Sequence, residues 1–176
     1  IYLHPGLKWV IDKIVVCNPI QFVNIRRNEV GAKISARNVK GAMESGKPLF
    51  LATSKEIQQR ATMALRDVHY IIEAHFEMTE KATTGDNPGK FQDIMRRRLA
   101  KGQCYHMPYF GVREFPVKFA PSKEKLPCPR ELAGEKDLGY MLYDMDYSDL
   151  QNITPMYFRA KMVDGVIDLR EAEVVK

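Results

Sequence analysis

A lysine stands in the first turn of a predicted helix, where the helix macrodipole favours acids. The segment GDNPGKF (85–91) supplies Asn87, a strong N-cap residue, and then Pro88, which suits the first helical position. Lys90 therefore falls among the unpaired amide groups of the helix start, where a cation is unfavourable for the helix itself. Such amides together with an ammonium group are well suited to hold a phosphate. We therefore predict that Lys90 contacts a phosphate group.

Two groups of basic residues accompany Lys90, one on the same predicted helix and one in the segment 21–47. The helix carries Arg96, Arg97 and Arg98, and the segment has six basic residues, of which Arg26, Arg27 and Lys33 are our candidates for RNA contacts. Side chains of this kind are either solvated surface charges or contacts to a nucleic-acid backbone. The residues alone leave both interpretations open.

Other polar residues have spacings that argue against metal binding. His69 and His75 share one face of a predicted strand, and at about 3.3 Å per residue they lie roughly 20 Å apart, too far for one metal ion. The glutamates around His75 are explained by solvent exposure, and the pair Asp144 and Asp146 lacks a third ligand. No Walker A, GxGxxG, GxSxG or HExxH motif occurs. We therefore expect no metal ion and no cofactor.

Composition indicates a globular chain with an anionic partner. With 176 residues, 45% of them hydrophobic, the chain can bury a core without a disulfide or a metal ion. The 27 Lys and Arg residues exceed the 22 acids, which gives a net charge of +5 and favours nucleic acid as a partner. The three cysteines are odd in number and unclustered, as reduced thiols are. No apolar run is long enough to span a bilayer, so we expect a soluble, cytoplasmic protein without membrane contact.

The elements that position these residues follow from hydrophobic periodicity. A nearly continuous apolar run predicts a buried strand at 7–20, and alternation predicts a half-buried strand at 65–78. The capped helix follows, with an apolar stripe made of Phe91, Ile94, Met95 and Leu99. Weaker signals predict irregular structure at 21–47, a short helix after Thr53, strands at 109–119 and 137–147, and a hairpin turn at Asp164-Gly165. This order of elements is typical of the α+β class.

Seven segments, in order from residue 1 to about 168, together resemble one known family. They are IYLHP, WVIDKIVVCNPI, RRNEV, LRDVHYIIEAHFE, NPGKFQDIMRRRLAKGQ, GVREFP and LGYMLYDMDY. With these the chain resembles the CRISPR-associated Cas5 family of subtype I-C, often called the d form. The resemblance implies an α+β fold of the repeat-associated superfamily: a ferredoxin-like (RRM-like) domain over 1–103 with a basic arm at about 21–47, then a small antiparallel β domain over 104–176. It also implies that the family's first strand and most of its first helix are absent.

The resemblance further implies an activity and a site. Family members cut the CRISPR repeat transcript at the base of its hairpin without a metal ion. They then stay on the 5′ handle of the crRNA, beside the backbone and large subunits of the surveillance complex. The family Tyr and Lys match Tyr2 and Lys90, and Phe91 occupies the position of the family His. His4 and His106 lie near the matched segments in sequence, and we name them as substitutes for that imidazole as acid or base.

Two alternatives belong to other functional classes. A non-catalytic subunit that only binds the crRNA handle is favoured by Phe91, because a phenyl ring cannot exchange a proton. A general binder of duplex nucleic acid, including duplex DNA, would use the basic arm and the arginine helix. Its binding would depend steeply on salt and little on sequence.

Overall fold

The computed structural model describes residues 3–123 and 127–176, so Tyr2 lies outside the described residues. The chain forms two compact units. The larger unit combines the segment up to Pro19 with His69–Lys176, and the smaller unit is Ile20–Val68. We call the smaller one the hairpin unit.

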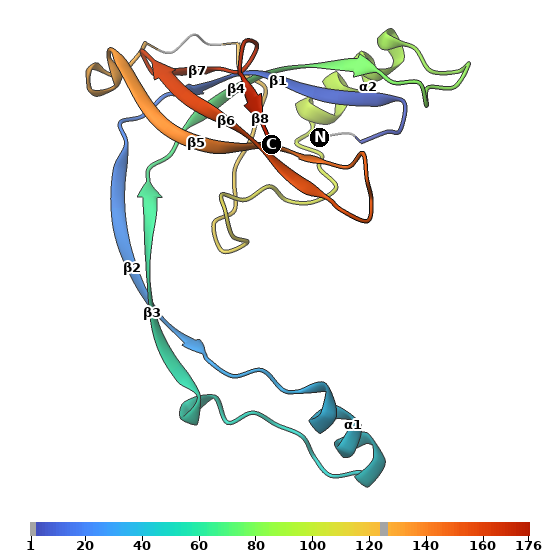
Figure 1. Cartoon of the computed structure of the whole chain (residues 1–176), viewed down its shortest axis with the longest axis vertical. Coiled ribbons are helices and arrows are strands. Elements are labelled where there is room, and N and C mark those ends of the chain that lie inside the picture. Colours follow the sequence, from blue (N-terminus) through green and yellow to red (C-terminus); the bar gives the residue numbers. More distant parts are fainter. Residues whose placement is uncertain (1–2, 124–126) are drawn as a thin grey trace. The chain divides into compact units, whose positions relative to one another are not determined.

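The larger unit is built on a six-stranded sheet in which every strand pair is antiparallel (Figure 1). Five strands lie in the spatial order β4-β1-β7-β6-β5, and β8 pairs with β6. Their bounds are β1 Leu7–Val16, β4 Tyr70–Met78, β5 Glu135–Asp146, β6 Thr154–Val163, β7 Val166–Asp168 and β8 Val174–Val175. One α-helix of this unit, α2 (Pro88–Ala100), follows β4. A mostly antiparallel sheet with few helices confirms the predicted α+β class.

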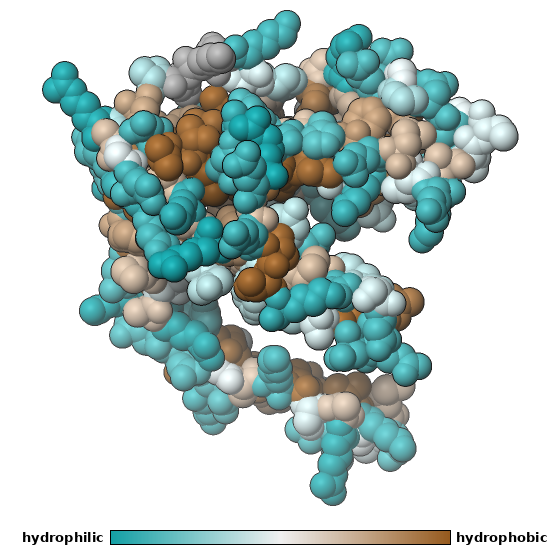
Figure 2. Space-filling view, turned by 45° about the horizontal axis from the view of Figure 1, so that its top comes forward, coloured by the Kyte–Doolittle hydropathy of each residue, from teal (hydrophilic) through white to brown (hydrophobic). Residues whose placement is uncertain are grey.

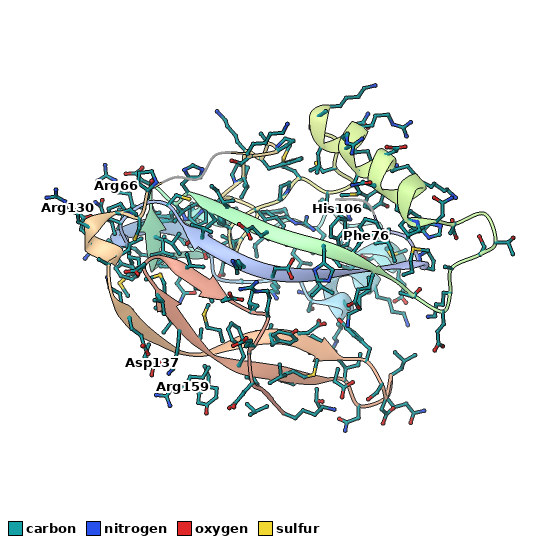
Figure 3. All side chains as sticks on the ribbon, turned by 90° about the horizontal axis from the view of Figure 1, so that it is seen from above. Arg66, Phe76, His106, Arg130, Asp137 and Arg159 are labelled. Atoms are coloured by element: carbon teal, nitrogen blue, oxygen red, sulfur yellow. The ribbon has the colours of Figure 1, made fainter. Side chains whose placement is uncertain are left out.

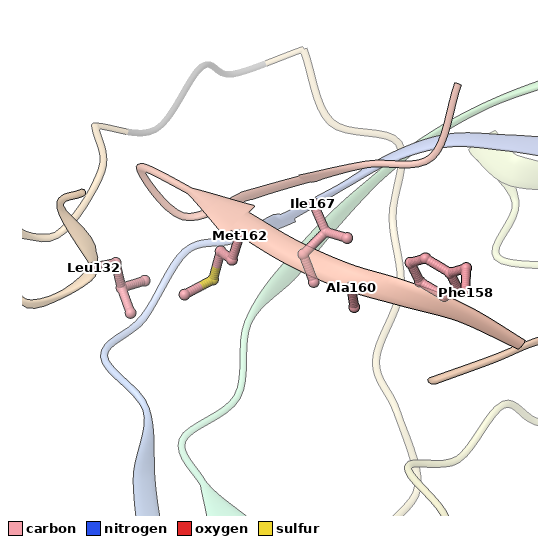
Figure 4. Close-up of a cluster of buried hydrophobic side chains, with 5 residues drawn as sticks. All are labelled: Leu132, Phe158, Ala160, Met162 and Ile167. Carbon is pink, nitrogen blue, oxygen red and sulfur yellow. The ribbon is translucent and has the colours of Figure 1, made fainter. Parts of the chain in front are cut away.

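The core of the larger unit lies on one face of β6. Alternate residues of that strand, Phe158, Ala160 and Met162, are buried, because successive side chains of a strand point to opposite faces. Ile167 of β7 and Leu132 of the 3-10 turn η2 (Arg130–Leu132) complete the cluster (Figure 4). The opposite face of β6 carries charges, with Arg159 donating from Nε to Asp137 of β5 at 3.0 Å (Figure 3).

The predicted hairpin turn at Asp164-Gly165 is confirmed. It joins β6 to β7, and both turn residues have positive φ angles, 48° and 77°. This is the geometry that a two-residue turn needs to match the twist of its strands, and it favours Asp-Gly. The glycine is required for a second reason, because a Cβ there would lie 3.1 Å from the carbonyl oxygen of Val16.

The hairpin unit differs from the predicted irregular segment and short helix. β2 (Gln21–Val30) and β3 (Ile57–Arg66) form ten antiparallel pairs, from Gln21 opposite Arg66 to Val30 opposite Ile57. Between them lie the helix α1 (Ala36–Ser45) and one 3-10 turn, η1 (Thr53–Lys55). The predicted helix after Thr53 is therefore wrong, because strand pairing with distant residues outweighs the local capping signal.

Two predicted strands are shorter than their sequence patterns indicated. The strand expected at 65–78 is interrupted at Asp67, which has a φ of 50°, so β4 begins only at Tyr70. The strand expected at 109–119 is reduced to one isolated bridge between Tyr109 and Pro116. In the described ranges, no helix is long and apolar enough to cross a membrane.

Candidate functional site at the start of helix α2

Helix α2 begins and ends where its sequence signals predict. The side-chain oxygen of Asn87 accepts a hydrogen bond from the backbone N–H of Lys90 at 2.8 Å, and Pro88 takes the first helical position. At the other end Gly102 adopts a φ of 61°, and the N–H of Gln103 donates to the carbonyl of Arg98 at 2.9 Å. Both ends are thus fixed by local contacts, which holds the first turn in place.

The ammonium group of Lys90 is anchored by the loop that precedes the helix. Its Nζ lies 2.8 Å from a carboxylate oxygen of Asp86 and 3.3 Å from the carbonyl oxygen of Gly85. The Asp86 side chain is only 2% exposed, and it also accepts hydrogen bonds from the N–H and hydroxyl of Thr83. The hydrogen bond from Lys90, with those from Thr83, holds the pKa of Asp86 well below its ordinary range. Two of the three ammonium donors therefore serve to position the group, and among the contacts of residues 3–123 and 127–176 the third is left for a ligand.

Phe91 belongs to the interior rather than to the chemistry. Its side chain is fully buried, and its ring meets that of Phe76 on β4 at 6.2 Å in an edge-to-face arrangement. Phe76 in turn packs against Trp9 of β1 at 5.9 Å, and it lies below α2 in Figure 3. Met95, one turn later on α2, is also buried. These contacts confirm the predicted apolar stripe.

The structure brings His4 to this site. Its imidazole lies 5.0 Å from the ring of Phe91, and its Nδ1 accepts a hydrogen bond from the backbone N–H of Gly6 at 3.0 Å. The loop that carries His4 is tied to the loop before α2, since the N–H of Thr79 donates to the carbonyl of Gly6 at 3.1 Å. His4 and Lys90 therefore border the same phenyl ring, although 86 positions separate them in sequence.

Other polar residues considered from the sequence have separate surroundings. His106 is exposed, and its ring packs edge-on against that of Tyr105 at 4.5 Å. The hydrogen bond that His75 donates to the Asp12 carboxylate raises the pKa of His75 above its ordinary value. Asp146 forms an ion pair with Lys176, so this carboxylate of the Asp144-Asp146 pair has a partner without a metal ion. Among the residues that the structure describes, no group of three His, Cys, Asp or Glu side chains is arranged to hold a metal ion.

The basic residues named from the sequence fall into both units. Arg96 is exposed on α2, 3.5 Å from Asp93, and Arg97 and Arg98 follow it. Arg26, Arg27 and Lys33 lie in the hairpin unit, where the first two belong to β2. Pattern reasoning missed two residues of interest. One is Asp86, and the other is Arg60, which the strand register places directly opposite Arg27.

Replacing Asp86 is expected to weaken the folded state in a pH-dependent way. Because its pKa is depressed on folding, its carboxylate stabilises the folded state above the unfolded-state pKa of about 3.9, and the contribution is lost as the pH falls through the lower folded-state value. Asp86→Asn should therefore unfold at a lower urea concentration than the unchanged chain at neutral pH. The difference between the urea midpoints of the two proteins should shrink below about pH 4.

The matched control is Asp93→Asn on the same helix, because that carboxylate is exposed and its ion pair is loose. Its urea midpoint should stay near that of the unchanged chain throughout the pH range. Equal midpoints for Asp86→Asn and the unchanged chain at neutral pH would contradict the anchoring role of Asp86.

Together these features define an α+β protein with an antiparallel sheet, an anchored lysine at a helix start and a basic hairpin. The chain belongs to the CRISPR-associated Cas5 family, d form, whose family model matches residues 1–170. It is 45% identical over 175 residues to the CRISPR pre-crRNA endoribonuclease Cas5d of Mannheimia succiniciproducens, covering 96% of this chain and 77% of that protein. It is 33% identical over 186 residues to the protein of the same name from Thermus thermophilus, covering 96% and 74%.

Solved structures show the same fold. A functionally uncharacterized protein from Streptococcus mutans matches with a TM-score of 0.64 at 23% identity, covering 99% of this chain and 78% of that one. A structure described as a CRISPR-associated protein matches with the same TM-score at 20% identity and with the same coverage. At these identities the likeness concerns the fold alone.

Proposed function

We propose that this chain is a metal-independent endoribonuclease that cuts CRISPR repeat precursor RNA at the base of its hairpin. It then remains on the 5′ handle as a subunit of the type I-C surveillance complex. The names of two relatives, both CRISPR pre-crRNA endoribonucleases, support the reaction. The observation that carries the proposal is the anchored ammonium group of Lys90 at the start of α2.

The reaction fits an ammonium group in this position. Without a metal ion, RNA is cleaved when a 2′-hydroxyl attacks the adjacent phosphate, which leaves a 2′,3′-cyclic phosphate and a 5′-hydroxyl. Negative charge develops on the phosphorane, and a preorganised cation stabilises it. Lys90 supplies that cation from a fixed place, beside the N–H groups of the first helical turn.

Tyr2 is proposed to orient or deprotonate the attacking 2′-hydroxyl. A tyrosine hydroxyl ordinarily has a pKa of about 10, so a phenolate at neutral pH requires a nearby cation. Lys90 is the cation that we propose for this task. Tyr2 lies outside the described residues, and its assignment rests on the family resemblance.

We propose that the hairpin unit binds the RNA backbone. It carries nine Lys and Arg residues against four acids, a net charge of +5, whereas the larger unit carries eighteen of each. The whole net charge of the chain is thus in the hairpin unit. Arg27 lies directly opposite Arg60, and like charges in that position destabilise a hairpin unless an anion lies between or beside them. Glu29 lies 3.4 Å from Arg60, and we propose that RNA phosphates supply further negative charge to Arg26, Arg27 and Lys33.

Subunits of the surveillance complex are proposed to cover the apolar part of the hairpin unit. None of residues 20–68 is buried, and Met43, Phe22 and Met63 are 80%, 63% and 75% exposed. Figure 2 shows such apolar side chains in brown among hydrophilic ones in the lower part of the view. A two-stranded hairpin is only marginally stable in water, so a covering partner would stabilise it. We propose the backbone and large subunits for this role.

The domain organisation is proposed on the same grounds. β1 pairs with β4, and α2, which follows β4, packs on this pair through Phe91 and Phe76. This arrangement supports the proposal that the remainder of a ferredoxin-like (RRM-like) domain lies within 1–103. β5, β6 and β7 would then form the small antiparallel domain of 104–176. In this structure the two sets of strands join in one sheet, since β1 pairs with β7.

A second candidate function is a non-catalytic subunit that holds the crRNA handle. The buried phenyl ring of Phe91, at the position of the family His, favours it. A general binder of duplex RNA or DNA is the third candidate. It is separated from the others by competition between a repeat hairpin and an unrelated duplex.

The test is an incubation of the full-length natural protein with RNA transcribed from the repeat of its own CRISPR array. EDTA is present throughout, and the ends of the products are analysed. We expect one cut at the hairpin base, with a 2′,3′-cyclic phosphate on the upstream product. Tight, sequence-specific binding without a cut would establish the non-catalytic subunit instead. Binding that an unrelated duplex competes away would establish the general binder.

A further inference from the structure

The four histidines of the chain have different surroundings. His75 is paired with Asp12, with Nδ1 2.9 Å from the carboxylate. His69 is exposed and directly precedes β4, and His106 is exposed with its ring against Tyr105. His4 contacts the first turn of α2 through Phe91, the residue that follows Lys90. His4 is therefore the imidazole that the fold places beside the candidate phosphate site.

We propose that His4 donates a hydrogen bond from Nε2 to the 5′-oxygen that leaves when the RNA chain is cut. This inference rests on the endoribonuclease function proposed above. Phe91 cannot donate a hydrogen bond to the leaving oxygen. The imidazole of His4, which packs on Phe91, can donate one. His4 would thereby contact the reacting atoms, which makes it a catalytic residue.

The contact with Gly6 decides which nitrogen of His4 carries a proton. The backbone N–H of Gly6 donates to Nδ1 at 3.0 Å, so Nδ1 has to be unprotonated. In the neutral ring the proton is then on Nε2. The neutral ring therefore carries its N–H on Nε2, and it does not have to gain or lose a proton during the reaction.

Close packing holds the donor in one position. The ring lies against Phe91 at 5.0 Å with an interplanar angle of 51°. A side chain at position 6 would be crowded, because a Cβ there would lie 3.0 Å from the Cα of Ala82 and 3.1 Å from Nδ1 of His4. The N–H of Thr79 binds the carbonyl of Gly6 as well. A donor fixed in this way is preorganised, which is the condition under which one hydrogen bond contributes strongly to catalysis.

Lys90 and His4 stabilise negative charge on different atoms during the reaction. The Nζ of Lys90 lies 5.9 Å from the centroid of the Phe91 ring that His4 also contacts. The bond from the 2′-oxygen to phosphorus forms while the bond from phosphorus to the 5′-oxygen breaks. The 2′-hydroxyl loses its proton to hydroxide, and the 5′-oxygen takes up a proton from water, which returns the hydroxide. Lys90 stabilises charge on the phosphorane, and His4 stabilises the departing oxygen while keeping its own proton.

The experiment compares two conservative variants that separate the donor from the acceptor. In His4→Asn the side-chain oxygen still accepts from Gly6, but the amide is too short to reach the place of Nε2. In His4→Gln the amide N–H reaches that place. Cleavage of the repeat hairpin RNA is measured in single turnover with the full-length protein, with His4→Ala as the null variant and His69→Ala as the control.

The expected result is a loss on the order of 10²-fold for His4→Ala and His4→Asn, with His4→Gln within about tenfold of the unchanged protein. A substrate with sulfur in place of the leaving 5′-oxygen needs no such donor, so on it all variants should cleave at nearly the same rate. His4→Asn cleaving faster than His4→Gln would indicate a purely structural role and overturn the inference, as would a loss that the sulfur substrate does not restore. If the unchanged protein cuts and His4→Ala cuts equally fast, the inference fails alone. If the unchanged protein does not cut, the proposed function fails and the inference with it.

Discussion

Lys90→Ala is expected to reduce the rate constant for repeat RNA cleavage by about 10³-fold, the upper end of the effect of removing one preorganised donor. The group removed carries a full positive charge, and Asp86 and Gly85 hold it in place before the substrate arrives. Binding of the hairpin should weaken far less, because the net charge of the chain is in the hairpin unit. Single-turnover rates and hairpin affinities, measured for the same preparations, check both expectations.

The controls for Lys90→Ala have to separate a loss of catalysis from the loss of one positive charge and from a loss of stability. Lys81→Ala removes the same charge from an exposed position in the same loop, and it should cut at the normal rate. Lys90→Ala leaves the Asp86 carboxylate without its cation, so the double variant Asp86→Asn/Lys90→Ala should recover stability without recovering cleavage. Cleavage by Lys90→Ala within about threefold of the unchanged protein would remove Lys90 from the mechanism.

Local sequence signals were sufficient for α2 and for the β6–β7 turn. Asn87, Pro88 and Gly102 act on backbone groups within a few residues of themselves, so the helix bounds can be predicted without tertiary structure. The Asp164-Gly165 turn is of the same kind, since its φ angles are a property of the two residues. These are the parts of the fold that sequence reasoning predicts correctly.

Contacts between distant residues could not be predicted in the same way. The pairing of β2 with β3 joins Phe22 to Leu65 across more than forty residues, and it overrides the capping signal at Thr53. The contact between His4 and Phe91 depends on β1 and β4 lying side by side, which no local pattern fixes. Proximity in sequence to the matched segments was the only reason to name His4.

The anchoring of Lys90 by Asp86 is an intermediate case. An acid four residues before a lysine is a visible signal, and on a helix it indicates an ion pair. Here Asp86 precedes the N-cap, so the helical rule does not apply, and the loop has to fold back through Thr83 to make the contact. The unfavourable cation of the first turn is thus compensated by an acid that lies outside the helix.

The other large effect is expected at Phe91, where truncation to alanine should lower the free energy of unfolding by about 3–5 kcal/mol. The side chain is fully buried, and it is in contact with Phe76 and His4. The total free energy of unfolding of a small domain is only about 5–15 kcal/mol, so a loss of this size would lower the unfolding temperature markedly. Phe91→Leu keeps most of the volume and should lose less, about 1.5 kcal/mol or under. Urea unfolding at neutral pH measures the free energy of unfolding of the unchanged chain, Phe91→Ala and Phe91→Leu.

Phe91→His tests whether the family side chain can be restored at this position. In this chain the side chain of residue 91 points into an apolar contact with Phe76, so an imidazole there would bury polar nitrogens without partners. We therefore expect Phe91→His to be less stable than Phe91→Leu and to cleave no faster than the unchanged protein, because His4 would lose its packing surface. A Phe91→His protein that is as stable as the unchanged chain and cuts repeat RNA faster would show that residue 91 faces the substrate. In that case the donor task would belong to residue 91 and not to His4.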